Sequence, residues 1–245
     1  MSSTSPIILI LGSGPNIGYH VSEAFRAKGY KVALASRKLN EEESTTDQVH
    51  VSSDLSDPES VAGVFSRVKA LLGLPSVVIY NAGAATINNE KEPLALPLAD
   101  FARDLNINTV SAFVAAQQAA AVFGQLPESA SKTFIYTGNI LNTTTMAPLM
   151  DLGVGKSATA HIIESAASAY ADRGFKYAIL APNPSKTRLT DCRFYYGDER
   201  KADGSAAYFD IDGGAHGKLY VELAEGKSQG PWQQTFVKGI GYKRF

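Results

Sequence analysis

Short runs of β-branched and other apolar residues alternate along this chain with segments that carry apolar residues at helical spacing. Uninterrupted apolar runs of this length are typical of strands that are buried on both faces. Strands that alternate with helices form right-handed βαβ units, which place the strands parallel in one sheet. The chain is therefore predicted to be an α/β domain with helices on both faces of the sheet. The predicted strands cover residues 7–11, 31–35, 48–51, 77–80, 133–136 and 177–180.

The segments between these runs contain helix signals. Residues 16–28 carry apolar side chains on one helical face. Asp57 and Pro58 have the residue types that favour the N-cap and first position of a second helix. Alanine-rich helices are expected over about residues 100–124 and 152–172.

The regular pattern ends after residue 182. Residues 183–215 are dense in Pro, Gly, Asp and aromatic residues, a mixture that is typical of an irregular segment over a binding site. We therefore predict one domain over residues 1–245, in which residues 183–225 form an irregular, substrate-covering segment. A last helix near residues 215–225 and a strand near 235–240 would complete the domain.

Length and charge limit the classes of function. A chain of 245 residues commonly forms one domain. Its 23 Lys and Arg residues balance 24 Asp and Glu residues, so it lacks the positive field that nonspecific nucleic-acid binding requires. The single cysteine, Cys192, excludes an internal disulfide, and the four histidines show no metal-ligand spacing. The apolar run at residues 7–11 is too short for a signal core or a membrane span, and we expect a cytoplasmic, metal-free protein.

A glycine-rich turn follows the first predicted strand. Glycines permit a tight turn and close helix packing, and the N-terminus of the next helix offers N–H groups to a pyrophosphate. Asn16 stands where another glycine is expected, so its side chain must point away from the phosphates. An ordinary strand-to-helix connection is the alternative, but the position after the first buried strand favours a dinucleotide site of the doubly wound Rossmann type. The turn reads Gly12, Ser13, Gly14, Pro15, Asn16, Ile17 and Gly18.

The end of the second predicted strand favours a phosphorylated cofactor. It reads Ser36, Arg37 and Lys38, with no carboxylate to accept hydrogen bonds from a ribose diol. A guanidinium suits bidentate recognition of a 2′-phosphate, whereas Lys38 alone could equally be part of a solvated basic turn. NADP(H) is therefore the predicted cofactor.

Further motifs together resemble the short-chain dehydrogenase/reductase family. The resemblance covers about residues 6–187, in the family's order and at nearly its spacings. It implies hydride transfer and a cofactor at the carboxyl edge of the sheet. The motifs are Asp54 and Leu55 after the third strand, Asn81, Ala82 and Gly83 after the fourth, Asn108 in a helix, and Lys156 in a later helix. By the resemblance, Asp54 and Leu55 would flank the adenine, Asn81, Ala82 and Gly83 would lie beside the cofactor, Lys156 would hold the nicotinamide ribose, and Thr187 would reach the nicotinamide amide.

The catalytic half of the family's site differs. Members pair a tyrosine with a lysine four residues later, but here Leu152 precedes Lys156 by that interval and has no proton to donate. The serine expected after the fifth strand is also missing, and Thr137 or Asn139 could replace it as a hydrogen-bond donor. The candidate catalytic residues are Lys156, Asn108 and Asn139.

Three tyrosines are alternative proton donors. Tyr136 ends the fifth predicted strand, and Tyr195 and Tyr196 lie in the segment expected to cover the site. Each has packing in the core as its more common role.

Three functions are consistent with these observations. The first is an atypical NADPH-dependent oxidoreductase that acts on a small organic carbonyl or enone. The second is a non-redox isomerase, lyase or cyclisation catalyst on the same fold, and the third is a cofactor-sensing regulatory protein. The expected partners are a small, apolar or aromatic substrate and further copies of the chain in a homodimer or homotetramer, without nucleic acid or membrane.

Overall fold

In the computed structural model, which describes residues 5–170 and 192–245, eight strands form one sheet in the order β3-β2-β1-β4-β5-β6-β7-β8. All neighbouring strands are parallel except β7 and β8. The chain reverses its direction of travel across the sheet at β1, as in a doubly wound domain. The predicted fold class is therefore confirmed. The strands are β1 (Ile7–Leu11), β2 (Lys31–Ser36), β3 (Gln48–Ser52), β4 (Val77–Tyr80), β5 (Thr133–Thr137), β6 (Arg193–Arg200), β7 (Gln233–Val237) and β8 (Gly241–Tyr242).

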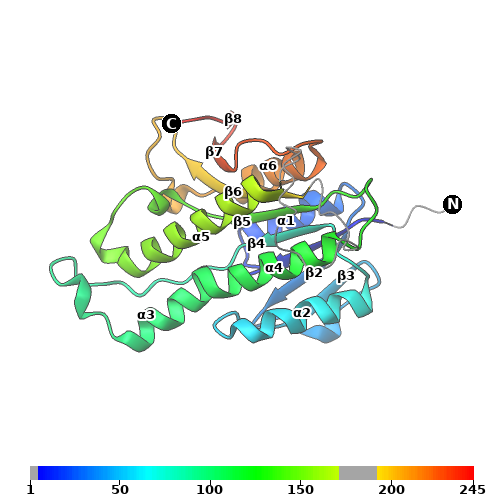
Figure 1. Cartoon of the computed structure of the whole chain (residues 1–245), viewed down its shortest axis with the longest axis horizontal. Coiled ribbons are helices and arrows are strands. Elements are labelled where there is room, and N and C mark those ends of the chain that lie inside the picture. Colours follow the sequence, from blue (N-terminus) through cyan, green and yellow to red (C-terminus); the bar gives the residue numbers. More distant parts are fainter. Residues whose placement is uncertain (1–4, 171–191) are drawn as a thin grey trace, which may run out of the picture.

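Helices cover both faces of the sheet (Figure 1). Helices α1 and α6 pack on one face, and α2, α4 and α5 pack on the other. The α-helices are α1 (Ile17–Arg26), α2 (Pro58–Leu71), α3 (Leu98–Leu105), α4 (Ser111–Phe123), α5 (Met150–Tyr170) and α6 (Gly213–Glu225). Short 3₁₀ turns are η1 (Glu41–Glu43), η2 (Pro93–Ala95), η4 (Ile140–Asn142), η5 (Ala147–Leu149) and η6 (Tyr208–Asp210).

Side-chain alternation divides the core into two layers. Along β1, Ile8 and Ile10 point into the layer beneath α1 and α6, whereas Leu9 and Leu11 point into the layer beneath α2, α4 and α5. All of these side chains are buried, which explains why the sequence shows an apolar run here.

The helix expected over residues 100–124 contains an irregular turn. Helix α3 leads into a π-helical turn, η3 (Asn106–Val110), and then into α4. A π turn inserts one residue into the helical ladder and is common at functional sites. Asn108 lies in this turn and is fully buried.

The prediction of an irregular segment is wrong for residues 193–200, because Arg193–Arg200 is the buried strand β6 between β5 and β7. The helix predicted near residues 215–225 is confirmed as α6, Gly213–Glu225. Charged residues obscured the strand, but they are paired inside the sheet: Arg200 Nε donates to Asp198 at 2.7 Å. Burial of charge is tolerated where the groups are paired and hydrogen-bonded. The strand expected at residues 177–180 lies outside the described residues.

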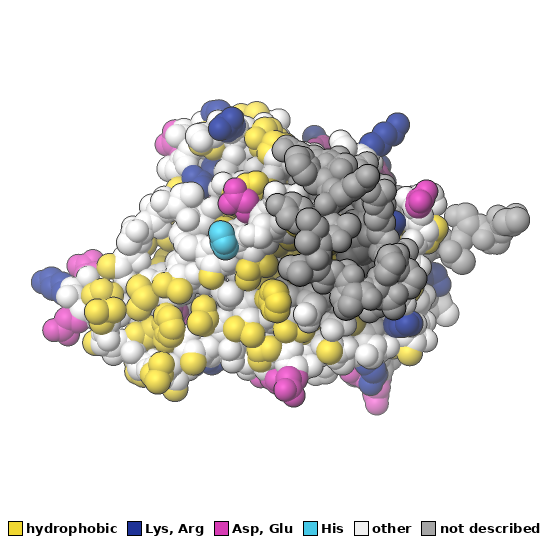
Figure 2. Space-filling model, viewed as in Figure 1, with side chains coloured by type: hydrophobic (Ala, Val, Ile, Leu, Met, Phe, Trp, Pro, Cys, Tyr) yellow, Lys and Arg dark blue, Asp and Glu magenta, His cyan; other side chains and the backbone are white. Residues whose placement is uncertain are grey.

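Apolar side chains are exposed on the α3, α4 and α5 side of the domain. Figure 2 shows hydrophobic side chains gathered at the lower left of the molecule, over α3. Exposed apolar surface of this kind is typical of contacts between proteins, and the homodimer or homotetramer stays a prediction. The exposed large apolar residues of this region include Ile87, Leu94, Leu98, Val110, Phe113 and Val154. In the described part of the chain, no helix combines the length and apolar character needed to cross a bilayer.

Substitution of Gly138 tests the packing between β5 and β6. A Cβ atom at this position would overlap the ring of Tyr196, so we expect Gly138→Ala to lower the free energy of unfolding by about 2–3 kcal/mol. Gly63→Ala is the matched control, because Gly63 lies in α2 with open space around it. That variant should gain about 0.5–1 kcal/mol from helix propensity. Urea unfolding measures both values, and equal effects would contradict the packing.

Candidate active site

The glycine-rich turn lies against the end of β4. Gly12 has a φ of +92°, and a Cβ atom there would lie 2.5 Å from the backbone nitrogen of Ala82. The Asn81 side chain donates to the backbone oxygen of Gly12 at 2.8 Å. At the other end of the turn, a Cβ atom on Gly18 would lie 2.7 Å from Cα of Ser13. The two glycines therefore have the close-approach roles that the sequence predicts.

The first turn of α1 is available to an anion. Among the described residues, no side chain caps the N-terminus of this helix, so its N–H groups point toward the carboxyl edge of the sheet. Asn16 has a φ of −96°, so the turn does not need a left-handed residue at this position. Its side chain turns away to contact Ile211 and Gly213.

A cavity of about 540 Å³ opens beside the turn, between α1 and the strands β2 and β3. Its walls include Ser13, Gly14 and Pro15, and at its far side Gln48 and His50. The hydroxyl of Ser13 is buried and has no hydrogen-bond partner within the described chain. A cradle of glycine backbone with an unpartnered hydroxyl fits the phosphate groups of a dinucleotide.

The expected adenosine-binding residues meet at adjacent strand ends. Ser36 and Ser52 are paired across β2 and β3, so the residues that follow each strand lie side by side. Arg37 and Lys38 are exposed, as is Asp54, while Leu55 is buried. The amide and hydroxyl of Ser56 lower the pKa of the Asp54 carboxyl, and the charge of Arg37 adds to this effect. Arg37 therefore lies close enough to Asp54 for their charges to interact.

Lys156 is buried at the same edge of the sheet. Its Nζ donates to the Tyr136 hydroxyl at 3.1 Å and to the backbone oxygen of Thr137 at 2.9 Å. Nζ also lies 4.5 Å from the centre of the Tyr136 ring. Burial lowers the pKa of Lys156 to about 7, although the charge of Asp198 acts in the opposite direction. The lysine is thus a fully packed group, although it lies in the first half of a helix at the edge of the sheet.

A tyrosine hydroxyl does contact the lysine, but it comes from a different element. Leu152 lies one turn before Lys156 on α5 and is partly buried, whereas Tyr136 reaches Lys156 from β5. Burial raises the pKa of Tyr136, and its hydroxyl donates to the backbone oxygen of Asn108 at 3.0 Å. Tyr136 therefore holds the lysine in place as a neutral phenol.

Asn108 fastens the loop that follows β4. Its side chain accepts from the backbone nitrogen of Ala84 at 3.1 Å and donates to the backbone oxygen of the same residue at 2.7 Å. Its backbone oxygen accepts from the hydroxyls of both Tyr136 and Thr159. A Cβ atom on Gly155 would lie 2.5 Å from Cβ of Asn108, so the glycine permits α5 to pack here.

Two residues, Thr137 and Asn139, could replace the expected serine. The Thr137 side chain is engaged on the α6 face of the sheet, whereas the Asn139 side chain is not. The hydroxyl of Thr137 accepts from Tyr220 of α6, on the other side of the sheet. The side-chain oxygen of Asn139 accepts from the Leu141 nitrogen at 3.0 Å, while its backbone nitrogen contacts the Tyr196 hydroxyl at 3.1 Å. The catalytic role predicted for Asn139, as a hydrogen-bond donor in place of the serine, stays a prediction.

The remaining candidates are placed as follows. Tyr195 and Tyr196 do not cover the site, since both are buried in β6. Tyr195 packs beneath α6, and Tyr196 packs against Trp232. Both are core aromatics, which was the alternative interpretation. Thr187 lies outside the described residues.

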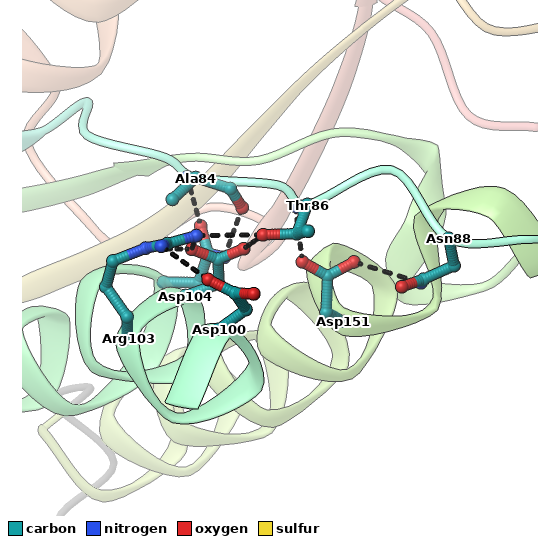
Figure 3. Close-up of polar contacts among 8 residues, drawn as sticks. Ala84, Thr86, Asn88, Asp100, Arg103, Asp104 and Asp151 are labelled. Carbon is teal, nitrogen blue, oxygen red and sulfur yellow. Dashed lines mark hydrogen bonds and ion pairs between the residues drawn. The ribbon is translucent and has the colours of Figure 1, made fainter. Parts of the chain in front are cut away.

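A buried carboxyl pair lies behind the β4 loop and was missed in the sequence (Figure 3). Thr86 joins the pair, because its hydroxyl donates to Asp104 at 2.7 Å and its backbone nitrogen donates to Asp151 at 2.8 Å. Burial raises the pKa of Asp151, and the neighbouring Asp104 adds to the effect. Burial would also raise the pKa of Asp104, but the hydrogen bonds from Thr86, Asp151 and Arg103 outweigh burial and lower it. The two carboxyls are therefore shifted in opposite directions, and Arg103 forms an ion pair of 2.9 Å with Asp104.

The pair could not be recognised from spacing, since Asp104 and Asp151 lie in different helices and nothing local links them. Together with Asn108 it fixes the loop that begins at Gly83. This loop borders the lysine: a Cβ atom on Gly83 would lie 3.9 Å from Lys156 Nζ.

The burial of Lys156 predicts a pH-dependent stability. Between the folded pKa of about 7 and the usual value of 10.5, the unfolded chain binds the proton more strongly, so stability should rise with pH through this range. Lys156→Met removes the titrating group. The difference between the free energies of unfolding of the wild type and the variant should therefore change in favour of the wild type by on the order of 2–4 kcal/mol between about pH 7 and pH 10. Urea titrations at several pH values measure the difference, and a constant difference would show that the lysine is not buried as described.

The sequence matches known oxidoreductases over most of its length. The model of the family described as enoyl-(acyl carrier protein) reductase matches residues 12–206. The chain is 47% identical to "Short chain dehydrogenase/reductase dmxR12" from Cryptosporiopsis sp. (strain 8999), over 99% of this chain and 96% of the relative.

Solved structures share the fold at low identity. A metagenomic short-chain oxidoreductase in complex with NADP has a TM-score of 0.77 at 15% identity, covering 98% of this chain and 100% of that one. An oxidoreductase from Brucella ovis with a partially ordered NAD has a TM-score of 0.69 at 17% identity, covering 95% of this chain and 99% of that one. These structures support the fold, while the family model and the 47% identical relative identify the family. This chain belongs to the short-chain dehydrogenase/reductase family.

Proposed function

We propose that the protein is an atypical NADPH-dependent reductase of a small organic carbonyl or enone. The observation that carries the proposal is the position of Lys156. Its buried Nζ lies beside Gly83, at the sheet edge that also carries the glycine-rich turn. A nicotinamide that extends from this turn along the edge would reach the lysine.

The residues at the edge fit the cofactor. The glycine turn and the first turn of α1 would hold the pyrophosphate, and Arg37 would hold the 2′-phosphate. Asp54 and Leu55 would border the adenine, and Asn81, Ala82 and Gly83 would border the nicotinamide half. When bound, the cofactor would supply a hydride to the substrate carbon.

The proton would come from Lys156. A carbonyl oxygen that gains negative charge needs a proton donor, and Leu152 has none. With a pKa of about 7, Lys156 can be protonated at neutral pH and can also give up its proton. Tyr136 and the Thr137 backbone oxygen orient Nζ through hydrogen bonds of 3.1 and 2.9 Å. The lysine would regain its proton from solvent after product release.

Leu152 supports a non-redox enzyme as the second candidate. An isomerase, lyase or cyclisation catalyst needs no proton relay to a hydride acceptor, and an apolar side chain at this position would shape its pocket. In this case the protein would bind NADPH but would not oxidise it in the presence of any carbonyl compound or enone. A cofactor-sensing protein would give the same result, and only a partner assay would separate the two.

Cofactor preference tests the role of Arg37. We expect the wild type to bind NADPH more tightly than NADH, and Arg37→Ala to lose about 1.5–3 kcal/mol of NADPH binding because a charged hydrogen bond to phosphate is removed. NADH binding should change little. Lys69→Ala is the matched control, since it removes one exposed positive charge near the end of α2. Fluorescence titration measures each affinity, and equal affinities of the wild type for the two cofactors would reject NADP(H) as the preferred ligand.

Leu152→Tyr tests whether only the acid is missing. A tyrosine one helical turn before Lys156 would place a phenol beside the ammonium, so we expect carbonyl reduction to rise by about 10²-fold or more. Val154→Tyr is the control, because Val154 lies on the same helix but is exposed. NADPH consumption against a panel of aldehydes, ketones and enones gives the rates. A Leu152→Tyr protein that binds NADPH but stays inactive would favour the non-redox candidate.

A further inference from the structure

A strap of residues 201–212 leaves the end of β6 and leads to α6. Its first half is a turn in which Lys201 N donates to the Ser205 oxygen at 2.8 Å. An ion pair of 3.0 Å between Lys201 and Asp210 joins the two halves. The strap therefore combines its own internal contacts with two buried residues, Ala206 and Ala207.

The strap contacts the loop that precedes α5. The Tyr208 hydroxyl donates to Met146 Sδ at 3.5 Å. Tyr208 has a φ of +48°, a conformation that is unusual for a residue with a side chain. Tyr208 is about half exposed, and Phe209 is as exposed as a phenylalanine in an extended peptide. Backbone strain beside exposed aromatic groups is typical of a segment that acts on a ligand.

The Asn16 side chain joins the other end of the strap to the glycine-rich turn. Asn16 Nδ2 donates to the Ile211 oxygen at 3.0 Å, and the Gly213 nitrogen donates to Asn16 Oδ1 at 3.1 Å. Asn16 itself is exposed, so these bonds are not a by-product of core packing. A Cβ atom at residue 213 would lie 2.6 Å from Asn16 Oδ1, so the glycine makes room for the contact.

The amino end of α6 is rigid where Asn16 meets it. The Asp212 side chain accepts from the Ala215 nitrogen at 2.8 Å and pairs with Lys238 at 2.6 Å. Its backbone nitrogen donates to Glu199 of β6 at 2.8 Å. The strap is therefore anchored at residue 212, and Asn16 links this anchored end to the glycine-rich turn.

We infer that Asn16 is a positioning residue that couples the occupied nucleotide turn to the strap. The inference depends on the proposed function only in taking NADP(H) as the ligand. The side chain belongs to the N-cap residue of α1, directly before the N–H groups that would hold the pyrophosphate. Phosphate bound there would fix the backbone of residue 16. The side-chain amide of Asn16 would then hold the strap against the loop that precedes α5. By reciprocity, a fixed strap strengthens NADP(H) binding.

The inference predicts that a glycine at position 16 weakens NADPH binding, although glycine is the usual residue in such a turn. Glycine is the residue expected in such a turn, and it would give the turn more conformational freedom. It would also remove both hydrogen bonds to the strap. Asn16→Gly should therefore weaken NADPH binding by about tenfold, a loss typical of the coupling between two sites.

The experiment compares the wild type with Asn16→Gly and Asn16→Ala. Calorimetry measures the NADPH dissociation constant, and hydrogen exchange measures the protection of residues 201–213 with and without NADPH. In the wild type, NADPH should slow exchange in the strap by about tenfold. In both variants this protection should be lost, while the unfolding temperature stays close to that of the wild type. Asn89→Gly is the matched control, because Asn89 is exposed and its side chain accepts from the backbone nitrogen of Lys91, a local contact two residues away.

The outcomes separate the inference from the proposed function. If the wild type binds NADPH and the Asn16 variants bind it equally well with the same strap protection, the coupling is wrong and the proposed function stands. If Asn16→Gly weakens binding but NADPH still protects its strap, Asn16 shapes only the turn, and the coupling is again wrong. If the wild type does not bind NADPH, both are wrong.

Discussion

The contact between the ends of β1 and β4 determines the arrangement of the site. These strands can approach at their carboxyl ends because residue 12 has no side chain to collide with Ala82. The chain crosses from β1 to β2 on one side and returns to β4 on the other, so the two connections diverge and leave a crevice between them. The glycine turn, the β4 loop and α5 all border this crevice. Replacement of Gly12 would therefore disturb the edge on which the described candidate residues lie.

Much of the cofactor half could be predicted because its signals are local. The glycine turn, the basic residues after β2 and the triplet after β4 each follow a buried strand directly, so parallel pairing brings them to one edge. The strand β6 could not be predicted in the same way. Its buried residues include Asp198, Glu199 and Arg200, and only the folded sheet supplies the partners that make their burial tolerable. The Tyr136 contact with Lys156 was equally hidden, because it joins residues 20 positions apart on different elements.

The polar interior on the α5 side of the sheet is organised by donors and acceptors that leave few groups unpaired. Lys156 binds a phenol and a carbonyl, Asn108 binds the backbone N–H and C=O of Ala84, and Thr86 joins Asp104 and Asp151 behind the β4 loop. Such networks specify one arrangement, because the loss of one member leaves a buried partner unsatisfied. The leucine at position 152 is compatible with this network, since no member of it depends on a hydroxyl at that position. Lys156 can therefore keep its place while the chemistry around it changes.

The π turn at Asn106–Val110 has a consequence for how this family member can evolve. It adds one residue to an otherwise continuous helix, and one residue corresponds to about 100° of rotation. Deletion of a single residue here would restore an ordinary helix, but it would turn α4 away from the sheet or α3 away from α5. It would also move Asn108, whose backbone oxygen accepts from the Tyr136 hydroxyl. The length of the chain between α3 and α4 is thus as much a part of the site as the identity of any side chain, and variation should be found as substitution and not as insertion or deletion.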